Sequence, residues 1–163
     1  MDDDIEITGS ELVLTVLRKV QIEKKRRIDL AKLNLMLFVI EGDGQVKSAL
    51  EFEETSTGPR SPFILEFIKN NKSLFSVRTA KPKKSEKISD PDYFKKVALS
   101  EEGLRVAENL SKLISRKYVR IIDELVDRWI DQPHGQILTY ICLFYPEFCT
   151  SIAKKGKQLL EGN

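Results

Sequence analysis

The sequence has little of what metal, disulfide and nucleophile chemistry requires. Its 163 residues include one histidine, His134, and two cysteines, Cys142 and Cys149, which are seven positions apart. One histidine and two cysteines without a close-spaced cysteine pair cannot supply the usual structural zinc site. Cys142 lies within the apolar run 137–144, so we expect it to be a small core residue. The sequence therefore predicts no metal site and no cofactor.

Long apolar runs and a targeting leader are also missing. The longest apolar run, residues 35–40, is about a third of the roughly 18 residues that a membrane span needs. The N-terminus is acidic, whereas a signal peptide begins with basic residues and continues with an apolar stretch. Eight glycines and six prolines exclude collagen-like and low-complexity classes. We expect a soluble, cytoplasmic protein that does not enter a membrane.

No group of residues has the pattern of a catalytic site. The Gly-Asp-Gly turn at 42–44 is not followed by the Lys-Ser/Thr pair that a phosphate-binding loop requires. The adjacent acids Glu53 with Glu54, and Glu101 with Glu102, are explained as solvated turn or helix-cap residues, and no base or nucleophile accompanies them. We therefore expect the protein not to be an enzyme.

Charge is present in separate blocks. The net charge is +2, but residues 18–32 hold seven bases against two acids, and residues 60–96 hold ten against four. Acidic stretches at 1–11 and 41–57 lie before and between them. We predict that the two basic clusters share one face, which would suit an anionic partner. The alternative is that each cluster is an ordinary solvated loop or helix face.

Periodic apolar residues predict three helices in the first half of the chain. The first is expected to begin with Ser10 as its N-cap and to bury one stripe of side chains. The second is expected from Asp29 to Gly42 and is apolar almost all round, as in a helix central to a core. The third is predicted over 62–71, with Ser61 as N-cap and a proline at its first position. The stripe residues of the first helix are Leu12, Val13, Val16, Leu17 and Val20.

Two strands and a basic loop follow these helices. Alternating side chains predict one strand over 74–79 and a second over 93–99 that closes a hairpin. Residues 80–92 between them hold two prolines and four lysines and show no apolar period. Three helices followed by a hairpin are typical of a winged helix, a form of helix-turn-helix in which the hairpin loop is the wing. We predict such a domain over 1–100, with an acidic N-terminal tail.

The remaining part, 101–163, is predicted to be a helical extension. Ser100 is expected to cap a helix that runs as far as Asp131, and a helix over 136–145 and a final short helix from 147 onward are expected to follow. One apolar seam follows the long helix, and either the final helices or a second copy of the chain must cover it. We predict a homodimer, with packing within the chain as the alternative. The fold class is thus mainly α with a small β-hairpin (α+β). The seam residues are Leu110, Ile114, Tyr118, Ile121, Leu125 and Trp129.

Three pieces of the chain resemble a known family. They are Arg-Ile-Asp-Leu-Ala-Lys-Leu at 27–33, Thr-Gly-Pro-Arg-Ser-Pro at 57–62 and Val-Ala-Leu-Ser-Glu-Glu-Gly at 97–103. They look like pieces of the small prokaryotic YwgA-like proteins and, more distantly, of Panacea-type (SocA-like) antitoxin domains. The Tyr-Pro-Glu piece within 140–147 is similar to the closing helix of that family, so the resemblance covers roughly 11–148. The resemblance implies a winged-helix fold and brings no established activity and no catalytic residues.

The function that these patterns predict is binding of double-stranded DNA by a transcriptional regulator. Its sequence reading is expected to be weak, because Glu66 on the third helix would repel the phosphate backbone. The alternative is a protein-interaction module, antitoxin-like or an adaptor, that does not bind DNA, since the fold hosts both functions. The residues predicted to contact DNA are Lys24, Lys25, Arg26, Arg27, Arg60, Ser61, Lys69, Asn70, Arg78, Lys81, Lys83, Lys84 and Lys87.

Overall fold

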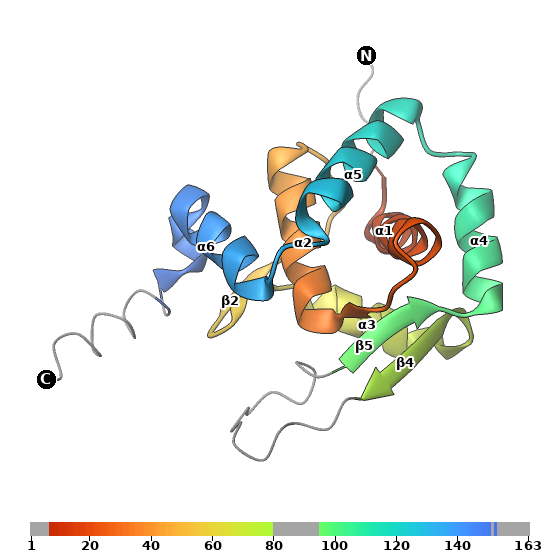
Figure 1. The fold of residues 1–163 in the computed structure, drawn as a ribbon, viewed down its shortest axis with the longest axis horizontal. Coiled ribbons are helices and arrows are strands. Elements are labelled where there is room, and N and C mark those ends of the chain that lie inside the picture. Colours follow the sequence, from red (N-terminus) through yellow and green to blue (C-terminus); the bar gives the residue numbers. More distant parts are fainter. Residues whose placement is uncertain (1–6, 80–94, 151, 153–163) are drawn as a thin grey trace, which may run out of the picture.

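The computed structural model describes residues 7–79, 95–150 and 152, and within them the protein is mainly helical with a small antiparallel sheet. This confirms the predicted α+β class. Figure 1 shows α2 in the middle of the molecule and α1 viewed almost along its axis. The elements are α1 (Gly9–Glu23), β1 (Ile28–Asp29), α2 (Leu30–Asp43), β2 (Glu53–Thr55), β3 (Gly58–Arg60), α3 (Pro62–Asn70), the 3-10 turn η1 (Lys72–Leu74), β4 (Phe75–Thr79), β5 (Lys95–Leu99), α4 (Glu101–Ser111), α5 (Arg116–Trp129), α6 (His134–Phe144) and the 3-10 turn η3 (Pro146–Phe148).

Helices α1 and α2 form the centre of the core, as their apolar patterns predict. All five stripe residues of the first helix are buried, and so is every residue from Leu33 to Ile40 in α2. Helix α1 packs against α3, α4 and α5, whereas α2 packs against α5 and α6. One cluster of buried side chains runs through both the N-terminal part and the C-terminal helices. The C-terminal helices therefore cover the same core rather than a separate one.

The start of α1 lies earlier than Ser10, so the predicted N-cap is wrong. Thr8 is the N-cap, and its hydroxyl accepts a hydrogen bond from the Glu11 backbone N–H at 3.2 Å. The Glu11 side chain reaches back to the Thr8 N–H, which completes a capping box. The Thr-x-x-Glu spacing satisfies two free N–H groups at once, and a single hydroxyl at Ser10 cannot do this.

The three-stranded sheet has the order β1-β5-β4, with both pairings antiparallel. The predicted hairpin is present as β4 and β5, with Val77 opposite Val97 and Arg78 opposite Lys96. Because side chains alternate along a strand, these two pairs point to opposite faces of the hairpin. Strand β1 joins β5 on its other edge, with Ile28 opposite Val97. Strands β2 and β3 form a separate two-stranded pair.

The helix predicted to run from Ser100 to Asp131 is two helices. Helix α4 ends at Ser111 and α5 begins at Arg116, after Ser115 caps it with a hydroxyl that accepts from the Tyr118 N–H at 3.4 Å. Figure 1 shows α4 and α5 on two different sides of α1, an arrangement that one straight helix could not reach. Gly103 permits the close approach at the start of α4, since a Cβ there would lie 2.0 Å from the Leu74 carbonyl oxygen.

The seam of the predicted dimer faces the protein's own core. Leu125 and Trp129 are buried within the chain. The other four residues are partly buried and packed against the same core. The break in the helix turns the seam inwards, so the alternative of packing within the chain describes these residues. The homodimer itself stays a prediction, but Leu125 and Trp129 are not exposed to form its interface.

The two cysteines form a disulfide bond, which the sequence patterns did not predict. Cys142, on α6, is partly buried against the core, and its disulfide partner Cys149 lies just after η3. The 3-10 turn brings the two Cα atoms to 5.4 Å, within the range that a disulfide spans. Most of the short helix predicted from 147 onward lies outside the described residues. Among the described residues, each helix is too short or too polar to pass through a bilayer.

Candidate nucleic-acid interface

The basic quartet, residues 24–27, lies in the connection between α1 and β1. Lys24 ends α1, and Lys25 follows with a φ of 52° in the left-handed region, which turns the chain towards the sheet. Strand β1 then pairs with β5. The pairing brings a segment from the beginning of the chain beside the base of the hairpin, so the quartet and the hairpin are neighbours.

Two cations of the quartet form ion pairs with α5 and with the residues that directly follow it. The Lys24 ammonium lies 3.1 Å from an Asp127 carboxylate oxygen, and the Arg26 guanidinium pairs with Asp131. Lys19 on α1 lies 3.3 Å from Asp123 and 2.8 Å from Glu23, both measured from Nζ to a carboxylate oxygen. The three aspartates are four positions apart and so share one face of the helix or its end. Part of the charge of the quartet is therefore balanced within the protein.

Arg27 fastens the quartet to the hairpin. Its guanidinium donates to the Ser76 carbonyl oxygen at 3.0 Å and to the Ser76 hydroxyl at 2.9 Å. Ser76 is on β4, on the same face as Arg78. A charged donor that makes two bonds to one residue holds the loop at a fixed place against the strand. The position of Arg27 is thus set by the fold.

Cations from three segments meet around one hollow of about 510 Å³ on this face of the hairpin. We call it the basic hollow, and Asp29 is the single acid among the residues that line it. Arg78 and Lys96 enter it from the hairpin, and the quartet and the start of α2 supply the others. The lining residues are Arg26, Arg27, Ile28, Asp29, Lys32, Arg78, Lys96 and Ile130.

Lys32, at the start of α2, is a half-buried cation of the basic hollow. Its ammonium donates to the Ile130 carbonyl oxygen at 2.5 Å. Burial lowers the pKa of Lys32, and the nearby Arg26 guanidinium lowers it further, against the opposing charges of Asp29 and Asp131. Both causes disfavour the charged form, and an anion bound in the hollow would relieve the second of them.

The predicted contact of Ser61 with a phosphate is wrong, because this side chain is inside the protein. Ser61 is 1% exposed, and its backbone N–H donates to the Asn34 side-chain oxygen at 2.9 Å. It occupies the N-cap position of α3, but its hydroxyl makes no capping bond. Asn34 also donates to the Leu30 carbonyl oxygen, so it ties α3 to α2. Arg60 is half-buried beside it.

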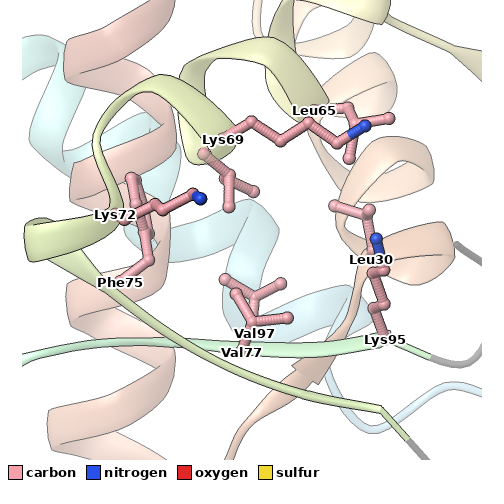
Figure 2. Close-up of a pocket in the computed structure, with 9 residues that line it drawn as sticks. Leu30, Leu65, Lys69, Lys72, Phe75, Val77, Lys95 and Val97 are labelled. Carbon is pink, nitrogen blue, oxygen red and sulfur yellow. The ribbon is translucent and has the colours of Figure 1, made fainter.

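The predicted contacts Lys69 and Asn70 are exposed, but they lie at the end of α3 and do not line the basic hollow. Lys69 borders a different space, of about 280 Å³, between α3 and the other face of the hairpin (Figure 2). We call this space the apolar cavity. Its apolar lining residues are Leu30, Leu65, Ile68, Phe75, Val77 and Val97, and its basic residues are Lys69, Lys72 and Lys95. The predicted contacts Lys81, Lys83, Lys84 and Lys87 lie outside the described residues.

Sequence reasoning missed Lys32 and Lys96 in the basic hollow, and Lys72 and Lys95 at the apolar cavity. Lys95 and Lys96 lie in the strand that the sequence predicts over 93–99, which was a signal for their place on the hairpin. Lys32 had no such signal, since its place follows from the packing of α2 against the end of α5. The pairing of the quartet with α5 likewise needed the tertiary structure.

Comparisons of the chain with protein-family models, with curated proteins and with solved structures found no match. Within the part of the chain that the structure describes, no three histidine, cysteine, aspartate or glutamate side chains gather where they could hold a metal ion. Among the described residues, the basic hollow and the hairpin are the features that bear on function.

Proposed function

We propose that the protein is a winged-helix protein that binds double-stranded DNA, as a cytoplasmic regulator of transcription, through the basic hollow. The observation on which this depends is the meeting of Arg26, Arg27, Lys32, Arg78 and Lys96 around one hollow. Cations that neutralise phosphates release counterions, and this release supplies most of the non-specific affinity for a duplex.

The order of the elements supports the proposal. Helices α1, α2 and α3 are followed by the β4–β5 hairpin, and β1 adds a third strand to the sheet. A winged helix has three helices followed by such a hairpin. The β2–β3 pair is an insertion between the second and third helices. The resemblance to YwgA-like proteins remains part of the proposal.

Weak reading of base sequence follows from the composition of α3. Its exposed side chains are Pro62, Phe63, Glu66, Lys69 and Asn70. Of these, Lys69 and Asn70 can hydrogen-bond to base edges, whereas Glu66 repels phosphates. We therefore propose that affinity comes from the basic hollow, and that α3 adds little discrimination between sequences.

The experiment is a titration of a fluorescent 20-base-pair duplex at increasing salt concentration, followed by anisotropy. The logarithm of the affinity is expected to fall linearly with the logarithm of the salt concentration. In the double variant Arg78→Gln/Lys96→Gln the slope is expected to become shallower by about two, because each lost phosphate contact contributes about 0.9. This result identifies the hairpin cations as phosphate contacts.

The matched control is Lys112→Gln/Lys117→Gln. It removes the same charge from exposed positions at the junction of α4 and α5, outside the basic hollow. Its slope is expected to equal that of the unchanged protein. Equal slopes for both double variants, or no binding at low salt, would overturn the proposal.

One observation favours the alternative, a protein-interaction module without DNA binding. Leu143 and Phe144, adjacent at the end of α6, are 72% and 64% exposed. Two large apolar side chains in water at one helix end suit contact with another polypeptide. Absence of duplex binding at low salt, in a protein with an unchanged fold, would favour this alternative.

A further inference from the structure

The apolar cavity is separate from the basic hollow. Val77, Lys95 and Val97 line the cavity, whereas Arg78 and Lys96 line the hollow. These residues alternate along β4 and β5, so the two spaces lie on opposite faces of the same hairpin. A ligand of the cavity would therefore not need to touch the surface proposed to bind DNA.

The floor of the cavity is apolar. Leu30, Ile68, Phe75 and Val97 are buried side chains at its base. Figure 2 shows Val77 and Val97 at the bottom of the space that separates α3 from the strands. No serine, asparagine or carboxylate lines the cavity among the described residues. A polar ligand body, such as a sugar, would leave its hydroxyls without partners there, which is costly.

The edge of the cavity is positively charged. Lys69 and Lys72 approach from the end of α3 and from η1, and Lys95 approaches from β5, with their nitrogens around the opening (Figure 2). Lysine stems pack on apolar surface while their ammonium groups stay in water. Three ammonium groups around an apolar floor repel cations and attract an anionic group held at the opening.

The volume limits the ligand to a small molecule. About 280 Å³ is just below the range of about 300–1,000 Å³ that small-molecule sites occupy. We propose that the apolar cavity binds a small carboxylic acid with a compact apolar body, such as an aryl- or alkyl-carboxylate. The body lies on the valines and leucines, and the carboxylate lies at the edge, where the side chains of Lys69 and Lys72 can turn to donate to it.

The test is a titration with 4-phenylbutyrate, followed by methyl NMR of leucine, isoleucine and valine residues. Shifts are expected at the methyl groups of Leu65, Ile68, Val77 and Val97. The neutral amide, 4-phenylbutyramide, has the same apolar body, and we expect it to bind at least about tenfold more weakly because a charge-assisted hydrogen bond is lost. The titration contains no DNA, so its result is independent of the proposed duplex binding.

The variant Lys69→Gln/Lys72→Gln separates the charge of the rim from the apolar floor. Binding of the acid is expected to weaken about tenfold, while binding of the amide stays the same. The control Lys112→Gln/Lys117→Gln should bind both as the unchanged protein does, since both lysines are outside the cavity. Equal affinities of acid and amide, shifts at other methyl groups, or no shifts at millimolar acid would each overturn the inference.

Discussion

The two faces of the β4–β5 hairpin differ in chemistry although they belong to the same ten residues. The face towards α3 has Val77 and Val97 and borders the apolar cavity. The opposite face has Arg78 and Lys96 and borders the basic hollow. Strand alternation places neighbouring residues on opposite faces, so a hairpin can serve two ligands of different chemistry. The segment beside each face is held by a different side chain. Asn34 binds Ser61 at the start of α3, and Arg27 binds Ser76 of β4 and so holds the quartet.

The largest loss of unfolding free energy is expected from Asn34→Ala, which removes the side-chain hydrogen bond between α2 and the start of α3. Asn34 is buried, and its side chain joins the Leu30 carbonyl to the Ser61 N–H. Its loss leaves a buried N–H without a partner, at a cost of about 2–3 kcal/mol in unfolding free energy. Urea unfolding measures this cost. Asn109→Ala, at an exposed position of α4, is the control and should change the free energy by less than about 0.5 kcal/mol.

Adjacent residues of β5 should respond differently to truncation. Val97 is 1% exposed and Lys96 is exposed. We expect Val97→Ala to lower the unfolding free energy by about 2 kcal/mol, because it removes two buried carbon atoms and leaves a cavity. Lys96→Ala should change it by less than about 0.5 kcal/mol. A similar loss in both variants, measured by urea unfolding, would contradict the division of the hairpin into two faces.

A smaller loss of unfolding free energy is expected from Arg27→Ala, at the basic hollow. The variant removes two hydrogen bonds to Ser76 from a half-buried guanidinium, so we expect about 1.5 kcal/mol, measured by thermal unfolding. Lys25→Ala, two residues earlier and exposed, should leave the free energy within about 0.5 kcal/mol. If Arg27→Ala were equally neutral, Arg27 would not be the residue that holds the quartet against β4.

The smallest effect is a pH dependence from His134, which interacts electrostatically with Asp29 and Lys32 of the basic hollow. Burial lowers the pKa of His134 from its ordinary value of 6.5, so the unfolded chain takes up a proton first as the pH falls. Its contribution to stability is fully present above pH 6.5 and is lost as the pH falls through the lowered value. The difference in unfolding free energy between the protein and His134→Gln should therefore shift against the protein from pH 7.5 to 5.5. A constant difference would contradict the direction of the shift.

Local sequence patterns predicted the first two helices and the first strand of the hairpin. The stripes of the first two helices and the alternation of residues 74–79 each depend on one periodicity, and tertiary packing did not alter them. The apolar seam from Leu110 to Trp129 led to the wrong prediction of one long helix, because its spacing continues across the break between α4 and α5. Ser115 in the middle of that seam was a signal, since serine is a favoured N-cap.

The site depended on contacts that local patterns do not contain. Lys24 and Arg26 form ion pairs with Asp127 and Asp131, about a hundred residues later in the chain. Burial of Ser61 by Asn34, and the pairing of Cys142 with Cys149, also required the packed structure. Lys69 and Arg78 were both predicted as DNA contacts. Their positions on different spaces, the apolar cavity and the basic hollow, follow from the packing of α3 on one face of the sheet, which the sequence patterns do not contain.

The most direct test compares two double variants that remove equal charge from the two faces. Arg78→Gln/Lys96→Gln changes the basic hollow, and Lys69→Gln/Lys72→Gln changes the edge of the apolar cavity. In the duplex titration at increasing salt, we expect a slope that is shallower by about two for the first variant and unchanged for the second. Equal reductions in both slopes would contradict the separation of the two faces.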